Sequence, residues 1–582
     1  MVHTDSIVFG AAGFIGRALV AELLRTGHTV TAAVRAGTQD RLRTWLAGQD
    51  IDTRALTITT TDIGEPDLAL GDTVEGVRDV YNAAALMKFG LDAHVARRVN
   101  LDGAMHVLEW AARQPDLRRI VHITGYRAEA GHTDYRAGAY EASKVEADAL
   151  LRKTAAARNI PLTFANPASV IGPGQFFGLA GVIDPLWRGE LPVLPGSADT
   201  FLPVVDLDYL ARFTVGLPTL PDTAGHSYPV LDPTTPNLPE LVRLVADHLR
   251  VAAPRFTVPT ALLRLLPQAL TNTDPETLSF ISSDRYDTSA SEEVAQRLGI
   301  SQPPVDELLR TYADGIVASR NGAVEGAPAA GFRDGTWLSG DRTHPEYVLL
   351  HGLPLNADSW TDVTRQLDAP VLTPDLPGLG RSAESNDGWT DELMAPVRTR
   401  PVLVGHSLGA GFAIDFALRH PDRVSRLVLI APWFLQAPAA RLTTSPIAAE
   451  VVKRLPASRL AAQLDIPAGP AITSAVADLR RPGVARRTFA VLRNVGHADH
   501  RADLAAKLAR ITVPVEIVIG ANDALIDSTE HPVTTVPDTG HFPQLTHPDR
   551  VAQIIRGVLP ADTSLSGRGE VTADCGAYAA EL

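Results

Sequence analysis

Two groups of residues in this sequence have the types and spacing that catalysis requires. The first surrounds a serine in the run 405–409, Gly-His-Ser-Leu-Gly, which follows an apolar strand-like segment and precedes an Ala-rich helical pattern. Glycines on both sides of a serine allow a strained strand-to-helix turn that lifts the hydroxyl above a sheet. We therefore expect Ser407 to act as a nucleophile, with the backbone N–H groups of Leu353 and Leu408 stabilising an oxyanion.

The partners that such a serine needs come later in the chain and in the required order. Asp523 lies in the loop after the strand-like run 515–520, and His541 follows a second short run at 533–536. We expect His541 to accept the serine proton as general base, while Asp523 orients the imidazole and stabilises its charged form. His406, beside the nucleophile, is expected to pack within the turn rather than to catalyse.

The second group is Tyr140 and Lys144, whose i, i+4 spacing places a phenol and an ammonium group on one helix face. The lysine can hold a ribose while its charge lowers the pKa of the phenol from about 10. The tyrosine can then exchange a proton with a substrate oxygen as a hydride moves to or from the adjacent carbon. Thr124, at the end of the strand-like run 120–123, is expected to hydrogen-bond the same oxygen.

A glycine-rich turn near the amino terminus indicates a dinucleotide site upstream of that pair. Gly10, Gly13 and Gly16 lie between an apolar strand and a helical pattern. The first glycine allows a tight turn, the second lets a pyrophosphate approach the backbone, and the third lets the helix pack against the strand. The N–H groups of Phe14 and Ile15, which open the helix, then point at the anion.

Arg35 determines which dinucleotide we expect. It ends the second strand-like run, at 28–34, where an acid would accept from a ribose 2′-hydroxyl and an arginine suits a 2′-phosphate. With Arg41 as a further cation, this position favours NADP; the alternative is a solvated charge at a strand end. Asp62 and Ile63, after the third run, are expected to flank the adenine.

Residues 5–318 resemble the extended short-chain dehydrogenase/reductases, which include NAD-dependent epimerases and dehydratases. The resemblance rests on the glycine turn, the tyrosine and lysine pair, Asn100 and the segment 166–174. It implies an α/β fold, with a Rossmann doubly wound parallel sheet over residues 1–320. It also implies a substrate-binding lobe mainly over 176–318 and NADP (NADPH) as cofactor.

Further residues of this half take their expected roles from their size or from the resemblance. The small Ala83 and Ala84, after the fourth strand-like run, would leave room for the cofactor over the sheet. Asn166 begins the segment that closes over the nicotinamide in the family. Gly125 and Tyr126 depart from the small hydroxyl residues that commonly follow Thr124 in the family, so the residue that binds the substrate oxygen stays open.

Residues 333–560 resemble the α/β-hydrolases. The resemblance rests on the His351-Gly352 loop, the glycine-rich loop 375–382, the serine turn and the Gly540-His541-Phe542 ending. It implies a second α/β sheet that carries a helical lid over about 433–510. A serine rather than an aspartate at the turn disfavours epoxide hydrolase and dehalogenase chemistry.

The chain length, net charge and cysteine count limit the domain organisation and the partners that we expect. A chain of 582 residues exceeds what one core usually organises, and the Gly/Pro-rich run 321–332 is typical of a linker. The net charge of -14 argues against nucleic acid and anionic membrane as partners. The single cysteine lies in the polar run 561–582, which we expect to be a flexible tail, so it supplies neither an internal disulfide nor a cysteine-based metal site. Without a leader or a long apolar run, the protein is expected to be cytoplasmic.

The sequence therefore predicts a bifunctional enzyme. An NADP-dependent ketone/alcohol oxidoreductase would be fused to a serine hydrolase that acts on an ester, lactone or thioester of a small molecule, as consecutive steps. Two alternatives stay open for the first half: an epimerase or dehydratase, in which the hydride returns, and a non-catalytic NADPH-binding module. A homodimer is included among the expected assemblies.

Overall fold

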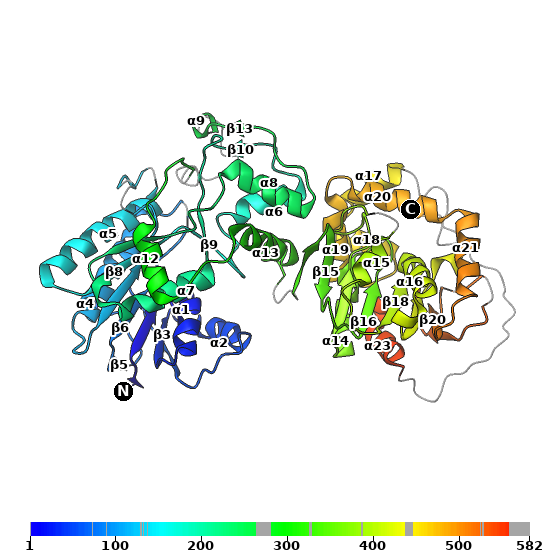
Figure 1. Ribbon diagram of the computed structural model, residues 1–582, viewed down its shortest axis with the longest axis horizontal. Coiled ribbons are helices and arrows are strands. Elements are labelled where there is room, and N and C mark those ends of the chain that lie inside the picture. Colours follow the sequence, from blue (N-terminus) through cyan, green and yellow to red (C-terminus); the bar gives the residue numbers. More distant parts are fainter. Residues whose placement is uncertain are drawn as a thin grey trace. The chain divides into compact units, whose positions relative to one another are not determined.

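The computed structural model describes residues 2–557, apart from 73, 89, 129–130, 132, 137, 264–280, 325–328, 386–387, 437–445, 524 and 527–528. The expected tail at 561–582 lies outside the described residues. The chain forms two compact units (Figure 1). The first consists of Met1–Ile183, Leu191–Ala246 and Ala253–Ile316, and the second of Asp184–Glu190, Asp247–Ala252 and Val317–Leu582.

The first unit is built on a parallel sheet of β2 (Ser6–Phe9), β3 (Val30–Val34), β4 (Leu56–Thr60), β6 (Asp79–Asn82), β7 (Arg119–Ile123), β8 (Leu162–Pro167) and β12 (Ser227–Val230). The strands lie in the order β12-β8-β7-β6-β2-β3-β4. The order reverses between β2 and β6, and sheets of this kind bind ligands beyond the carboxyl ends of the strands at such a point. The predicted Rossmann sheet is confirmed, and β12 shows that part of the expected substrate lobe extends this sheet.

Helices cover both faces of this sheet, as parallel strands require. One apolar cluster packs α1 (Phe14–Arg25), α7 (Leu207–Gly216) and α12 (Ser289–Leu298) on one face. A second cluster packs α4 (Gly103–Ala111) and α5 (Ala139–Arg158). The other helices are α2 (Gln39–Ala47), α3 (Ala93–Ala96), a π-helix at Arg97–Asp102, α6 (Ala180–Arg188), α8 (Leu238–Leu249), α9 (Thr260–Leu263) and α13 (Val305–Ala318). Short parallel pairs join β1 (Val2–His3) to β5 (Val74–Glu75), β9 (Ser169–Ile171) to β11 (Val204–Asp206) and β10 (Leu194–Pro195) to β13 (Thr257–Val258).

The second unit is built on β14 (Ala330–Arg333), β15 (Thr336–Gly340), β16 (Tyr347–Leu350), β17 (Val371–Pro374), β18 (Val402–His406), β19 (Arg426–Ile430), β20 (Val515–Gly520) and β21 (Val533–Val536). These strands lie in the order β14-β15-β17-β16-β18-β19-β20-β21. β15 pairs antiparallel with both β14 and β17, and the remaining neighbours pair in parallel. The predicted second α/β sheet is therefore confirmed.

The hairpin of β14 and β15 corrects the predicted linker. Residues 330–332, expected to belong to the linker 321–332, instead begin a strand. Asp334 and Gly335 both have positive φ, of 50° and 82°, and an Asp-Gly pair of this kind suits a two-residue hairpin turn. The hairpin is held by Phe332 and Trp337, whose rings meet edge to face at 5.0 Å.

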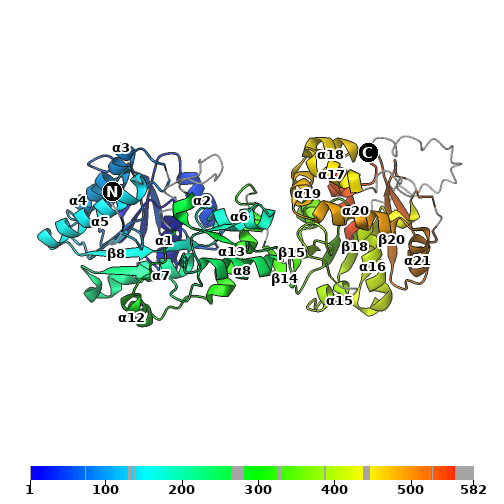
Figure 2. The ribbon, with the colours of Figure 1, turned by 90° about the horizontal axis from the view of Figure 1, so that it is seen from above.

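Helices flank the second sheet as well. Those that follow the sheet strands directly are α14 (Thr361–Leu367), α15 (Trp389–Met394), α16 (Leu408–Arg419), α22 (Pro543–Thr546) and α23 (Pro548–Arg556), with short 3-10 turns at Ala357–Trp360, Pro421–Arg423 and Trp433–Leu435. Within the predicted lid, the chain forms α17 (Pro446–Arg454), α18 (Ala457–Gln463), α19 (Pro470–Arg480), α20 (Val484–Val495) and α21 (Ala498–Leu508). The first four gather on one side of the unit (Figure 2), around an apolar cluster that includes Leu355 and Phe542 of the body.

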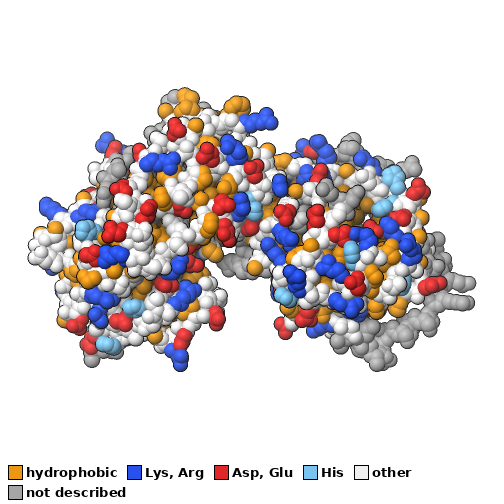
Figure 3. Space-filling view, in the orientation of Figure 1, with side chains coloured by type: hydrophobic (Ala, Val, Ile, Leu, Met, Phe, Trp, Pro, Cys, Tyr) orange, Lys and Arg blue, Asp and Glu red, His pale blue; other side chains and the backbone are white. Residues whose placement is uncertain are grey.

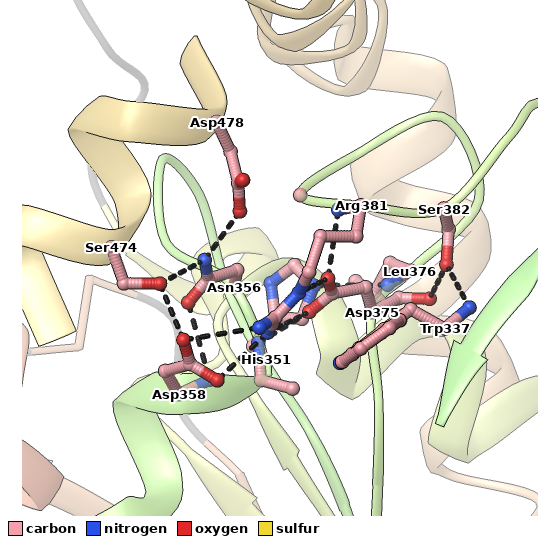
Figure 4. Close-up of polar contacts among 12 residues, drawn as sticks. Trp337, His351, Asn356, Asp358, Asp375, Leu376, Arg381, Ser382, Ser474 and Asp478 are labelled. Atoms are coloured by element: carbon pink, nitrogen blue, oxygen red, sulfur yellow. Dashed lines mark hydrogen bonds and ion pairs between the residues drawn. The ribbon is translucent and has the colours of Figure 1, made fainter. Parts of the chain in front are cut away.

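A buried ion cluster lies beneath the lid (Figure 4). Arg381 donates from Nε to Asp375 Oδ2 and from Nη2 to Asp358 Oδ1, each at 2.8 Å, and its guanidinium lies 4.7 Å from the Trp337 ring. Burial opposes the ionisation of Asp358, but Arg381 outweighs this effect and holds the pKa of Asp358 well below its usual range. Both Arg381 and Asp375 are buried, so each depends on the other for charge compensation.

The same cluster attaches the lid to the loop that follows β16 (Figure 4). Asn356 donates from Nδ2 to Ser474 Oγ and to Asp478 Oδ2 on α19, each at 2.7 Å. The backbone N–H of Ala357 donates to Asp375 at 2.6 Å. One set of buried hydrogen bonds therefore fixes both the loop and the lid helix.

No described helix combines the length and the apolar character that a membrane span requires. On the face seen in Figure 3, basic and acidic side chains are interspersed over both units. The excess of acidic residues is therefore not gathered into one patch on that face.

Replacing Arg381 should destabilise the second unit. Arg381→Met would leave the buried Asp375 without its cation and Asp358 with Arg320 alone, at 3.5 Å, which should cost about 3–5 kcal/mol. The control is Arg365→Met, because Arg365 pairs with Asp362 at the surface and should contribute less than about 1 kcal/mol. Urea unfolding of the full chain measures both changes. Equal stabilities for the two variants would contradict the role given to the buried cluster.

Candidate active sites

The serine turn joins β18 to α16 with strained backbone geometry. Ser407 has φ 48° and ψ −113°, a conformation that non-glycine residues adopt rarely and at a cost. A Cβ at Gly405 would come within 2.6 Å of Ala410 Cα, and one at Gly409 within 2.5 Å of Leu350 O. Both glycines are therefore required by close approach of the backbone, as the spacing predicted.

The structure brings together the three side chains expected from sequence in this unit. His541 Nε2 lies 2.9 Å from Ser407 Oγ, and His541 Nδ1 lies 2.9 Å from Asp523 Oδ2. An ionised carboxylate only accepts, so Nδ1 carries the proton and Nε2 is left to accept from the serine hydroxyl. This geometry is the one that proton removal from Ser407 needs.

Two further residues hold this arrangement. Gln436 donates from Nε2 to Asp523 Oδ2, although no motif in the sequence marks it. His406 donates from Nε2 to the carbonyl oxygen of His541 at 2.9 Å. Burial and the neighbouring His541 keep the pKa of His406 well below its usual value, so it stays neutral. His406 thus packs within the turn, as expected, and also supports the backbone of His541.

The loop after β16 lies against Ser407. A Cβ at Gly352 would come within 2.7 Å of Ser407 Cβ, so the backbone at Gly352 lies directly against the serine turn. Leu353 is the next residue of this loop. His351 is buried; it accepts from the N–H of Leu376 at 2.9 Å and donates to the Gly352 carbonyl at 3.0 Å. Leu408 is the first residue of α16. The oxyanion role of Leu353 and Leu408 stays a prediction.

In the first unit, the glycine turn has the predicted close contacts. Gly10 has φ 76°, and a Cβ there would come within 2.7 Å of Ala84 Cα. A Cβ at Gly16 would come within 2.2 Å of Gly10 O. Gly13 is exposed and precedes α1, and its N–H donates to Gly10 O at 2.9 Å. A Cβ at Gly10 would also come within 2.9 Å of the backbone carbon of Ala83, so the chain after β6 passes directly beside the turn; room for a cofactor there stays a prediction.

The tyrosine and lysine pair lies in the first two turns of α5. Lys144 donates from Nζ to Ile123 O at 3.1 Å, directly before Thr124. Burial lowers the pKa of Lys144 to about 8. The Thr124 hydroxyl is buried without a hydrogen-bond partner among the described residues, which fits a bound substrate oxygen. Asn100 donates to Ser143 Oγ at 3.0 Å, next to Lys144.

The remaining residues expected at the cofactor lie around the carboxyl ends of the strands. Arg35 is exposed directly after β3, and Asp62 accepts from the N–H of Gly64 at 2.9 Å. The side chain of Ile63 packs beside Gly103 in an apolar core cluster, and the place of Asp62 and Ile63 at an adenine stays a prediction. Asn166, on β8, donates to Ser227 Oγ at 2.9 Å, and its Oδ1 has no partner among the described residues.

Comparisons with known proteins cover both units. The model of the NAD dependent epimerase/dehydratase family matches residues 6–187, and that of the alpha/beta hydrolase family matches residues 347–554. A pimeloyl-[acyl-carrier protein] methyl ester esterase of Aromatoleum aromaticum is 33% identical over 251 residues, which is 37% of this chain and 98% of that protein. An esterase of Mycobacterium tuberculosis is 29% identical over 306 residues, 46% of this chain and 93% of that protein.

Among solved structures, the chain is similar to the terminal R domain from the myxalamid PKS-NRPS biosynthetic pathway. The identity is 20% and the TM-score 0.46, over 56% of this chain and 94% of that one. The two family models match separate halves of the sequence. The second half of the chain belongs to the α/β-hydrolases, and the first half is a domain of the NAD-dependent epimerase/dehydratase family fused to it.

Proposed function

We propose that the second domain is a serine esterase and the first a nicotinamide-dependent oxidoreductase. The esterase assignment rests on the hydrogen-bonded series of Ser407, His541 and Asp523 at a strained turn. The names of the similar proteins, both esterases, support an ester as the bond that is cleaved. Fusion in one chain supports two consecutive steps on one small molecule.

In the proposed hydrolysis, Ser407 Oγ attacks the ester carbonyl carbon as His541 Nε2 takes its proton. Asp523 stabilises the imidazolium, and the N–H groups of Leu353 and Leu408 donate to the oxyanion. His541 then gives its proton to the departing alcohol, which leaves an acyl group on Ser407. Water attacks this acyl-enzyme with His541 again as base, and the acid is released.

The first domain has the features that a nicotinamide dinucleotide requires, and NADP is the cofactor that we propose. The exposed Gly13 leaves backbone N–H groups at the start of α1 open to a pyrophosphate. When bound, such a cofactor supplies or accepts a hydride. Tyr140 would give the substrate oxygen a proton, Thr124 would donate a hydrogen bond to it, and Lys144 would hold the ribose and favour the phenolate.

An epimerase or dehydratase is a second candidate for the first domain, because the matching family model bears that name. In that case the hydride returns within each turnover. The absorbance of NADPH separates the two: an oxidoreductase changes it in proportion to product, whereas an epimerase leaves it constant.

Removing the proposed nucleophile should abolish hydrolysis. Ser407→Ala should lower kcat for a p-nitrophenyl ester on the order of a thousandfold or more, and Asp523→Asn should cost less. A fluorophosphonate should label Ser407, and far more slowly in His541→Ala. The matched control is Ser458→Ala, an exposed serine on α18, which should change nothing. Labelling at another serine would exclude this site.

Carbonyl reduction should depend on Tyr140 and on the charge of Lys144. Tyr140→Phe should lower kcat by a factor of about 100 or more, while Tyr135→Phe, whose hydroxyl donates to Glu146, should have little effect. Because burial lowers the pKa of Lys144 to about 8, the lysine is charged below that pH and neutral above it. The kcat/KM should therefore fall as pH rises through about 8. Full activity of Tyr140→Phe with NADPH still bound would favour the non-catalytic alternative.

Arg35 should favour NADPH over NADH. A guanidinium–phosphate contact is among the strong charge-assisted hydrogen bonds. Arg35→Asp should weaken NADPH by a factor of roughly 10 to 100 and affect NADH less, as measured by cofactor fluorescence. Equal affinities for both cofactors in the unchanged protein would rule out this preference.

A further inference from the structure

The turn after β19 is joined to the loop of Asp523 by two hydrogen bonds. Gln436 donates from Nε2 to Asp523 Oδ2, the same oxygen that lies 2.9 Å from His541 Nδ1. The backbone N–H of Ile526 donates to Leu435 O at 2.9 Å. Gln436 is only 5% exposed, whereas the side chain of Asp523 is 21% exposed. A buried amide therefore holds a carboxylate that is itself only partly buried.

Arg501 on α21 holds the same turn by its backbone. Its Nη1 donates to Trp433 O at 2.9 Å, and its Nη2 donates to Gln436 O. The guanidinium also lies 5.6 Å from the centre of the Trp433 ring, and the exposed His500 stacks on that ring at 5.7 Å. A planar guanidinium donates to two oxygens in one fixed geometry. Arg501 therefore sets the position of Gln436, the residue that donates to Asp523.

The helix that carries Arg501 packs with the body of the second unit. Leu504 and Leu508 of α21 are buried in the apolar cluster that also contains Leu408 of α16 and Leu427 of β19. The cluster around which the other four lid helices gather contains no described residue of α21. This helix thus belongs to the body, although it lies within the stretch predicted as lid.

A neutral donor suits the position of Gln436. Asp523 must keep its negative charge, because that charge stabilises the imidazolium that forms when Ser407 loses its proton. An amide N–H orients the carboxylate without neutralising it. On its other sides, His541 faces the ring of His406 at 5.3 Å, with His351 beyond it, and burial lowers the pKa of both of these histidines.

We propose that Gln436 and Arg501 are positioning residues for Asp523 and that they act in series. Arg501 places the turn, the turn places the Gln436 amide, and the amide fixes the carboxylate that orients His541. Both residues act through Asp523 and not on the ester itself. The proposal rests on the proposed hydrolysis at Ser407, and it makes that reaction depend on α21.

The first test measures kcat, KM and the pH profile of p-nitrophenyl ester hydrolysis by full-length variants. Gln436→Met removes the donor but keeps the side-chain length, so kcat should fall about tenfold and KM should change less than about threefold. Without the amide, more negative charge faces His541, and the midpoint of the acidic limb of kcat/KM should rise by about half a pH unit. Gln436→Glu places a like charge beside Asp523 and should raise this midpoint further. The matched control is Gln463→Met, an exposed glutamine on α18, which should change neither quantity.

The second test asks whether Arg501 acts through Gln436. Arg501→Met should move the midpoint in the same direction as Gln436→Met. Arg501→Lys should do so as well, because lysine keeps the charge but loses the forked donation to two oxygens. If the residues act in series, Arg501→Met should add nothing in the Gln436→Met background. Arg493→Met, which removes an exposed arginine from α20, is the control and should have no effect.

The outcomes separate positioning from a purely structural role. A lower kcat in Gln436→Met with an unmoved midpoint, with or without a lower Tm, would make Gln436 structural and overturn the proposal. Additive effects of Arg501→Met and Gln436→Met, or full rescue by Arg501→Lys, would overturn the action in series. If Ser407→Ala retained hydrolysis, the proposed function itself would fail. If Ser407 were required while Gln436→Met left kcat and the midpoint unchanged, only this inference would fail.

Discussion

Backbone segments approach one another in both domains more closely than any side chain would permit. Gly520 ends β20 three residues before Asp523, and a Cβ there would lie 2.2 Å from the carbonyl oxygen of Gly540, the residue before His541. The loops that carry Asp523 and His541 therefore meet through glycine. Gly405 and Gly409 allow the same close approach at Ser407, and Gly10 and Gly16 allow it at the amino-terminal glycine turn. In each case the missing Cβ sets the position of the neighbouring functional group.

The lid adds a second constraint on the hydrolase site. Its helix α19 is bound through Ser474 and Asp478 to Asn356, and the same loop touches Ser407 through Gly352. A buried amide that must satisfy two oxygen partners allows few alternative positions, because an unpaired buried polar group is costly. The geometry of the proposed oxyanion N–H groups is thus tied to the position of α19.

The sequence predicted both folds and the residues now seen at each strand end, because glycine spacing and residue order carry that information. It did not predict Gln436, since this is a single side chain whose partner Asp523 comes from a distant segment, with no spacing to mark it. The β14–β15 hairpin could have been predicted from Asp334-Gly335, but the small residues before it are typical of a linker. The position of Ile63 after a strand did not reveal that its side chain packs beside Gly103, because Gly103 comes from a segment far along the chain.

Arg381 and Arg17 show how one residue type takes two roles according to its surroundings. Both are buried, and both lie beside a tryptophan ring. Arg381 lies between Asp375 and Asp358, and these carboxylates overcome the effect of burial and raise its pKa well above the usual value. Its charge is compensated within the fold, so it needs no ligand. For Arg17, burial and the nearby Arg41 both lower the pKa of the guanidinium. The Phe14 and Trp45 rings beside Arg17 attract its charge without neutralising it, so the described residues compensate this cation far less than they compensate Arg381.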